Sequence, residues 1–167
     1  MKTTEPDFLK KIEAHKGIIH KVSRTYFEDA DDREDLSQEI ILQLWKSYSS
    51  FQGKSQFSSW MYRVALNTAI LYFKKEKKKV IGSDITGLEE KIANSESDGK
   101  ENQLAHFYRA VHQLNKIEKA LILQFIEGFS GDEIASNLGM TAGNVRVKLN
   151  RTKKKLEKII KDQGYEF

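Results

Sequence analysis

The chain has 167 residues, a mildly basic net charge of +4 and no cysteine, so it forms neither disulfides nor thiolate zinc sites. No stretch approaches the ~18 consecutive apolar residues of a membrane span, and the first residues lack the apolar core of a secretory signal. We therefore expect a cytoplasmic protein without membrane insertion, made of one or two domains. A single proline and 39% hydrophobic residues favour an all-helical chain.

The first predicted element is a helix over residues 7–27, in which apolar residues recur at helical spacing on both sides of Gly17. We interpret the acidic segment 28–35 as a turn that supplies carboxylates to the start of the next helix, where the helix dipole favours negative charge. That helix, predicted over residues 36–45, carries apolar residues on more than one face. Some of this surface is expected to contact a partner, although burial on several sides within its own domain explains the pattern equally well.

Residues 47–59 are rich in serine and glycine and are predicted to form a loop. A helix follows over residues 60–72, and lysines occupy most of residues 74–79. Aromatic rings stack on unpaired bases, side-chain amides read base edges, and lysines follow a phosphate backbone. The segment is therefore typical of a surface for single-stranded nucleic acid, but aromatic residues at helical spacing, such as Trp60 and Tyr72, are more often core residues.

Glycines, serines and acids dominate residues 80–103, where six acidic side chains stand against two lysines. We interpret this net-negative segment as a flexible linker. It separates two predicted helical domains, residues 1–79 and 104–167, each of which has a surplus of basic residues. The expected organisation is therefore two basic helical domains joined by an acidic tether.

Residues 128–158 have the pattern of a helix-turn-helix. Asp132 and Glu133 lie at the expected start of a short helix, whose dipole they complement. Gly139 suits the left-handed conformation that ends a helix, and Thr141 suits the N-cap of a second helix. The apolar residues expected to face the core are Ile134, Ala135, Leu138, Val145, Leu149, Leu156, Ile159 and Ile160.

The second helix of such a unit lies in the DNA major groove. There, Arg and Lys pair with guanine edges, Asn pairs with adenine, and further lysines contact phosphates. The DNA-binding candidates are Thr141, Asn144, Arg146, Lys148, Asn150, Arg151, Lys153 and Lys154. A solvated amphipathic helix in a bundle is the alternative, which the joint spacing of turn, cap, small residue and apolar plug disfavours.

Three groups of residues occur along the chain: DLSQE at 35–39 leading to Trp45, FSSW at 57–60 leading to Asn67, and EIA at 133–135 leading to Val145 and Arg151. In this order they strongly resemble the extracytoplasmic-function (ECF) sigma factors, the small two-domain members of the bacterial sigma-70 family. The resemblance implies an all-α fold of two helical domains that directs promoter-specific transcription by bacterial core RNA polymerase. It implies no catalytic residue, no cofactor and no metal.

The resemblance also assigns residues to each task. It implies that the helix at 36–45 binds the clamp helices of the largest polymerase subunit. The residues assigned to this contact are Asp35, Gln38, Glu39, Ile41, Leu42, Gln43 and Trp45. It implies that the loop at 51–57 captures a base flipped from the non-template strand of the minus-ten element, and that the next helix helps to melt the duplex. The residues assigned to the minus-ten element are Phe51, Lys54, Ser55, Phe57, Trp60, Arg63, Asn67, Lys74 and Lys75.

By the same resemblance, the helix-turn-helix reads the minus-thirty-five element through the candidates named above. An anti-sigma protein is a possible partner that covers the polymerase-binding faces, and the free protein is expected to be a monomer. The chain departs from the family pattern in three places. Family members often have arginines after the melting helix, whereas this chain has Lys74 and Lys75, which keep the charge but lose the bidentate geometry. Lys54 stands where the family loop often has an acid or another polar residue, which leaves the base preference open. Asn115 stands where a proline is common, which is expected to affect only the hinge.

Two other functions fit part of the pattern. A helix-turn-helix regulator would bind an operator without polymerase, but a sensor domain has no reason for residues 35–39 and the aromatic loop. An enzyme acting on nucleic acid would need convergent carboxylates, a metal cluster or an activated nucleophile. The four histidines show no ligand spacing, and Asp31, Asp32 and Asp35 are better explained as a helix start. We therefore expect no enzymatic activity.

Overall fold

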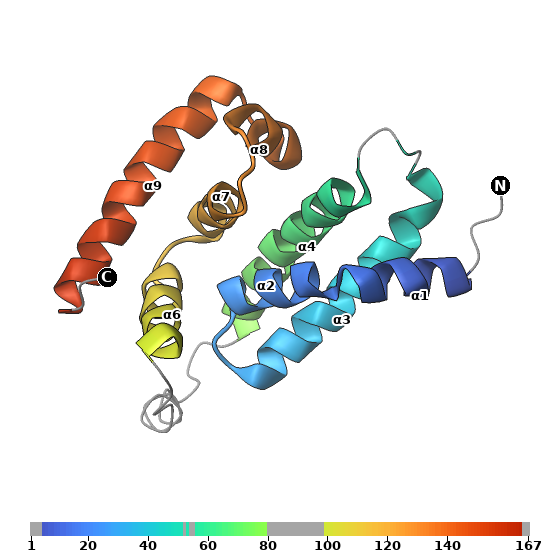
Figure 1. Cartoon of the computed structure of the whole chain (residues 1–167), viewed down its shortest axis with the longest axis horizontal. Coiled ribbons are helices and arrows are strands. Elements are labelled where there is room, and N and C mark those ends of the chain that lie inside the picture. The colour runs from blue at the N-terminus through green and yellow to red at the C-terminus, as the bar shows by residue number, and fades with distance from the viewer. Residues whose placement is uncertain (1–4, 52, 54–55, 80–98, 165–167) are drawn as a thin grey trace. The chain divides into compact units, whose positions relative to one another are not determined.

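The computed structural model describes residues 5–51, 53, 56–79 and 99–164 (Figure 1). The chain divides into two compact units, Met1–Phe73 and Lys74–Phe167. Every regular element among the described residues is a helix, and each of the two units contains several helices. The all-α, two-domain prediction is therefore confirmed. Most of the predicted linker, residues 80–98, lies outside the described residues.

Five elements lie before this gap. They are α1 (Glu5–Ala14), α2 (Lys16–Tyr26), α3 (Ala30–Ser47), the 3-10 helix η1 (Tyr48–Ser50) and α4 (Phe57–Lys79). The helices α2 and α3 pack side by side, and a hydrogen bond of 2.8 Å joins the hydroxyls of Ser23 and Ser37. Leu36, Ile40 and Leu44 line the buried face of α3 and are fully enclosed. Burying each such side chain contributes about 1.5–3 kcal/mol relative to leaving it in water.

The single helix predicted over residues 7–27 is wrong, because the chain forms two helices that break at His15. The backbone there has φ −122° and ψ 21°, outside the helical region. The amide of His15 donates to the carbonyl of Ile12 rather than to that of Lys11. The Nδ1–H of His15 donates to the Lys11 carbonyl over 3.0 Å instead, so the side chain satisfies the acceptor that the break leaves free.

Residues 30–35 of the acidic segment belong to α3, and only Glu28 and Asp29 precede the helix. Asp29 is the N-cap, and its carboxylate accepts from the amides of Asp31 (3.1 Å) and Asp32 (3.2 Å). The predicted start at residue 36 is therefore too late. The segment satisfies the first orphan amides of the helix, as the dipole argument anticipates for carboxylates near a helix start.

The loop predicted over residues 47–59 is shorter than expected. The chain continues from α3 directly into η1, where the Ser50 hydroxyl donates to the Ser47 carbonyl over 2.6 Å. The helix α4 begins at Phe57, and the amide of Trp60 donates to the carbonyl of Gln56 over 3.1 Å. Serine competes for local backbone bonds, so a serine-rich segment does not by itself specify an open loop.

The second unit contains four described helices. They are α6 (Gly99–Val111), α7 (Lys116–Ile126), α8 (Gly131–Leu138) and α9 (Ala142–Asp162). The helix α6 begins within the segment that the sequence predicts as linker. Asn115, which was expected to affect only the hinge, is the N-cap of α7. Its side chain accepts from the amides of Ile117 and Glu118, and the Glu118 carboxylate accepts from the Asn115 amide, which completes a capping box.

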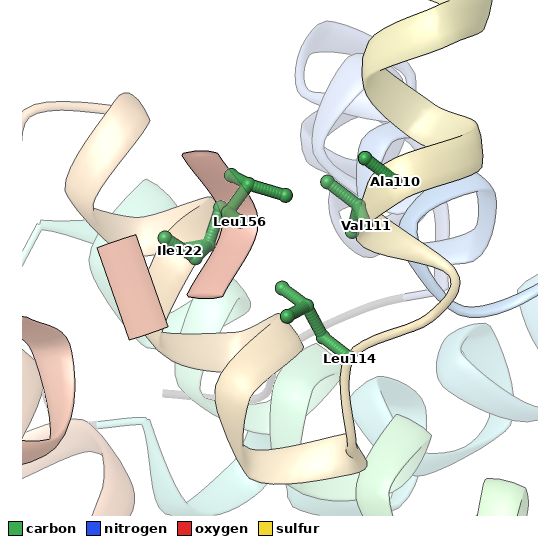
Figure 2. Packing of buried hydrophobic residues seen from close by; sticks show 5 residues of the cluster. All are labelled: Ala110, Val111, Leu114, Ile122 and Leu156. Atoms are coloured by element: carbon green, nitrogen blue, oxygen red, sulfur yellow. The ribbon is translucent and has the colours of Figure 1, made fainter. Parts of the chain in front are cut away.

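The core of this unit is built on both sides of α7. On one side Ile122 meets Ala110 and Val111 at the end of α6, Leu114 in the turn after it, and Leu156 of α9, as Figure 2 shows. On the other side Leu121 packs with Ile134 and Ala135 of α8 and Val145 of α9. Adjacent residues of α7 thus belong to two clusters, which explains why this helix is apolar on more than one face. The two clusters fix α8 and α9 against the same support.

Candidate nucleic-acid and polymerase interfaces

The helix-turn-helix prediction is confirmed in its local geometry. Gly139 ends α8 in the left-handed conformation, with φ +68° and ψ 35°. A side chain at this position would strain the backbone, whereas glycine adopts the conformation freely. The Thr141 side chain accepts from the amide of Asn144 over 3.1 Å and so caps α9. Ala135 and Val145 are 6% and 1% exposed, in keeping with the predicted close crossing and apolar plug.

The start of α8 is held by a reciprocal pair that the sequence analysis missed. The Ser130 hydroxyl accepts from the amide of Glu133 over 3.1 Å, and the Glu133 carboxylate accepts from the amide of Ser130 over 2.9 Å. The signal was present, because Ser130 and Glu133 have the S-x-x-E spacing of a capping box. The backbone N–H of Ser130, followed by its side chain, holds the pKa of Glu133 below its ordinary value.

This lowered pKa gives the second unit a pH dependence with a definite sign. The carboxylate stabilises the folded chain above the ordinary glutamate pKa of about 4.3, and this contribution is lost as the pH falls through the lower folded value. We expect Glu133→Gln to lower the urea midpoint of unfolding at neutral pH, with the difference from wild type shrinking on acidification. Circular dichroism of the full chain measures it, with Glu157→Gln as a charge-matched control. A difference that stays constant with pH would contradict the assignment.

The candidate residues on α9 divide by exposure. Val145, Thr152 and Leu156 are buried, which leaves the opposite face of α9 to solvent. The exposed candidates are Thr141, Asn144, Arg146, Lys148, Asn150, Arg151 and Lys154. They begin at the capped N-terminus of α9 and extend over its first turns. This is the part of a recognition helix that faces base edges.

Lys153 differs from the other candidates. Its side chain is half-buried, and its Nζ lies 3.8 Å from the ring centroid of Phe125 at the end of α7. A cation at this distance is attracted to the ring face. Lys155, two positions further on, pairs with Glu118 at 2.9 Å. Two of the consecutive lysines are therefore engaged within the unit, and Lys154 between them is exposed.

The aromatic residues assigned to the minus-ten element gather in one cluster with Tyr48. Ring centroids lie 5.7 Å apart for Phe51 and Phe57, 5.1 Å for Phe51 and Trp60, and 5.4 Å for Phe57 and Trp60. Trp60 is only 5% exposed, whereas Phe51 and Phe57 are half-buried. The Trp60 ring thus supports the other two from within, and the rims of Phe51 and Phe57 reach the surface.

Lys11 of α1 lies over this aromatic cluster, and sequence reasoning did not find it. Its Nζ is 5.4 Å from the ring centroid of Phe57, 5.7 Å from that of Tyr48 and 5.9 Å from that of Phe51. The His15 ring lies 5.3 Å from that of Phe57. No pattern within α1 indicates this contact, because it depends on how α1 packs against a segment far along the chain.

The remaining minus-ten candidates lie along α4 or outside the described residues. Arg63 and Asn67 are exposed and one helical turn apart, so they share a face of α4. Lys74 and Lys75 lie further along the same helix. Lys54 and Ser55 lie outside the described residues.

The polymerase-binding candidates lie on the outer side of α3. Leu42 and Trp45 are 43% and 42% exposed, although Trp45 also packs against Phe8 with ring centroids 5.0 Å apart. Glu39 and Gln43 are half-buried, and the Gln43 amide donates to the Glu39 carboxylate over 3.0 Å. The other candidates here are Asp35 and Gln38, which are exposed, and Ile41, which is half-buried. The apolar residues of α3 therefore divide between a buried core face and an exposed face.

Two further properties concern the described residues. No group of three or more His, Asp or Glu side chains in that part of the chain is arranged to hold a metal ion. None of the helices described is long and apolar enough to cross a membrane.

Comparison with known proteins decides the family. The model of sigma-70 region 2 matches residues 12–79, and the model of sigma-70 region 4 matches residues 105–156. The ECF RNA polymerase sigma-E factor of Escherichia coli K12 is 26% identical over 154 residues, which cover 83% of this chain and 80% of that protein. The chain is an ECF sigma factor of the sigma-70 family.

One further relative and two solved structures are similar to this sigma factor. The RNA polymerase sigma-H factor of Pseudomonas aeruginosa is 25% identical over 147 residues, 81% of this chain and 76% of that protein. The sigma factor RpoE, solved with the anti-sigma factor NepR from Bartonella quintana, has the same fold. Its TM-score is 0.69 at 19% identity, over 93% of this chain and 97% of that one. CnrH, solved with the cytosolic domain of CnrY, has a TM-score of 0.66 at 18% identity, over 95% of this chain and 90% of that one.

The family membership settles the choice between a sigma factor and a helix-turn-helix regulator that binds an operator without polymerase. Because both a region 2 and a region 4 are matched, the chain functions as an RNA polymerase sigma factor, and a regulator that acts without polymerase is not favoured. Sigma factors are transcription initiation factors rather than enzymes.

Proposed function

We propose that the two units of this sigma factor read the two promoter elements with the residues assigned above, and that α3 carries the contact to core polymerase. The observation that carries the proposal is the exposed, capped N-terminal part of α9. Asn144 and Arg146 lie there with side chains in solvent, behind a turn fixed by Gly139 and Thr141. Helix N-termini and exposed Arg and Asn side chains are suited to phosphates and base edges.

The second unit binds the minus-thirty-five element in the major groove. Arg146, Lys148 and Arg151 have the chemistry to pair with guanine edges, and Asn144 and Asn150 with adenine. Lys154 contacts a phosphate. Lys153, held over Phe125 at 3.8 Å, contributes a positive potential near the backbone while also joining α9 to α7. Its direct contribution to base reading is therefore the smallest of the set.

The first unit captures and melts the minus-ten element. The rims of Phe51 and Phe57 form the surface on which an unpaired base stacks, and buried Trp60 holds these rings in position. Asn67 and Arg63 extend this surface along one face of α4. Extruding a base costs a few kcal/mol of stacking, which contacts with aromatic and amide groups offset.

Core polymerase binds the exposed face of α3, with Leu42 and Trp45 as apolar anchors among the polar residues of the same helix. Large exposed apolar side chains rimmed by polar ones are typical of protein interfaces. The protein acts where the polymerase is, in the bacterial cytoplasm. In the absence of polymerase an anti-sigma protein covers this face, as a sigma factor of the same fold was solved with an anti-sigma factor.

The test is transcription from a promoter library by bacterial core polymerase, with and without this protein. Initiation at a discrete promoter with two separate elements supports the proposal. The proposal would be overturned if the protein failed to bind core polymerase and yet bound a specific DNA duplex on its own. For the anti-sigma partner, affinity capture of the tagged full chain from uninduced cells should recover a stoichiometric second protein. Recovery of polymerase alone would count against that partner.

A further inference from the structure

One residue on the outer face of α9 does not fit the chemistry of its neighbours. Val147 is 47% exposed, whereas Val145, two positions earlier, is 1% exposed and packs in the core. At helical spacing Val147 shares its face with Asn144 and Arg151, one turn before and after it. The middle of the proposed DNA-reading face therefore holds an apolar, β-branched side chain between polar and charged ones.

Neither folding nor helix formation explains this valine. Val147 belongs to neither of the two apolar clusters described for the second unit. A β-branched side chain loses χ1 freedom in a helix, so valine is a poorer choice than lysine or glutamine at an exposed helical position. Position 143, one turn earlier on this face, is a glycine, and a Cβ added there would meet nothing within 4 Å. The surface around Val147 is thus open to close approach.

We infer that Val147 is a specificity residue that recognises a thymine of the minus-thirty-five element through its C5 methyl group. This inference rests on the proposed function of α9. The thymine methyl is the apolar group that the major groove presents, and apolar side chains are its usual contact. Residues one turn apart lie about 5–6 Å from each other, and base pairs are stacked about 3.4 Å apart. The thymine therefore lies within about two base pairs of the bases read by Asn144 and Arg151.

The experiment removes the apolar group from each side of the contact in turn. The minus-thirty-five element is first defined with the promoter library, and each thymine in it is then replaced singly by deoxyuridine, which differs only in lacking the methyl. Binding of the holoenzyme to each duplex is measured for wild type and Val147→Ala. At one position, deoxyuridine should weaken wild-type binding about fourfold, the ratio that corresponds to burial of one methyl group.

The coupling between the two changes decides the inference. Val147→Ala should weaken binding to the thymine promoter severalfold and make binding indifferent to deoxyuridine at that position, whereas Arg151→Ala should weaken binding yet keep the deoxyuridine effect. An element that is read normally but shows no deoxyuridine effect coupled to Val147 would overturn the inference and leave the proposed function intact. If binding of the holoenzyme did not depend on the sequence of the minus-thirty-five element at all, the proposed function itself would be overturned.

Discussion

Replacement of Leu42 by glutamate is expected to weaken binding of core polymerase at least tenfold while leaving the first unit folded. Leu42 is 43% exposed on α3, on the side away from Leu36, Ile40 and Leu44. Burying a leucine at an interface contributes about 1.5–3 kcal/mol, and each 1.4 kcal/mol corresponds to about a tenfold change in affinity. The glutamate also places a charge where the proposed interface excludes water. Fluorescence anisotropy of the labelled full chain titrated with core polymerase measures the loss.

A matched control separates this effect from a general one. Leu71 is 65% exposed on α4 in the same unit, so Leu71→Glu introduces the same charge on another helix. We expect its affinity for core polymerase to stay within about twofold of wild type, since surface substitutions away from special features usually change energies by about 0.5 kcal/mol or less. Equal losses for the two variants, or none for Leu42→Glu, would remove α3 as the polymerase contact.

A substitution of Trp45 would test the same face of α3 less specifically. Its ring lies 5.0 Å from that of Phe8, which is itself 2% exposed, so removing the indole would disturb the packing of α1 on α3 as well as the surface. Leu42 is 43% exposed and is not one of the buried core residues of this unit. The affinity lost in Leu42→Glu can therefore be assigned to the interface.

The parts of the fold that the sequence predicts well are those specified by local chemistry. Gly139 and Thr141 act within a few residues of themselves, as a left-handed end and as an N-cap, and the structure has both as expected. Val145 follows from helical periodicity alone. The two capping boxes, at Ser130 and Asn115, were equally readable because each has a glutamate three residues later.

The parts that the sequence did not predict depend on tertiary packing. The break at His15 follows from backbone bonds that no periodicity encodes, since apolar residues continue at helical spacing across it. Lys11 lies over rings of residues 48–57 only because α1 packs there. Exposure likewise decides which residues of a helix are apolar anchors: Leu42 and Leu44 are equivalent in the sequence, yet 43% and 0% exposed.

The minus-ten candidates also show which features the sequence predicts and which depend on packing. Trp60 and Phe57 have the same aromatic chemistry, and the sequence assigns both to the minus-ten element. Because Trp60 is 5% exposed beneath Phe51 and Phe57, it is suited to positioning these rings rather than to stacking on a base itself. Only the packed structure distinguishes the supporting ring from the exposed ones.

The residue assignments in the two units predict that Arg146→Ala and Asn67→Ala damage different promoter elements. Both side chains are exposed, so neither truncation leaves a cavity in the core. A well-paired base contact is worth about 1–3 kcal/mol, which corresponds to a loss of roughly five- to 140-fold in initiation from an intact promoter for Arg146→Ala. This loss should vanish on a promoter whose minus-thirty-five element is scrambled, because the contact is already absent there. Abortive initiation assays on the matched promoters measure it.

Asn67→Ala should behave in the opposite way. The loss of initiation that Asn67→Ala causes should persist when the minus-thirty-five element is scrambled and vanish when the minus-ten element is changed. The effects of the two substitutions should add in the double variant, because the residues lie in different units. Lys154→Ala is the matched control, since a lost phosphate contact weakens binding to all sequences alike and lowers the slope against log salt by about 1. If Arg146→Ala lost activity equally on both promoters, its side chain would be a phosphate contact like Lys154. Base reading by α9 would then rest on the remaining candidates, Asn144, Lys148, Asn150 and Arg151.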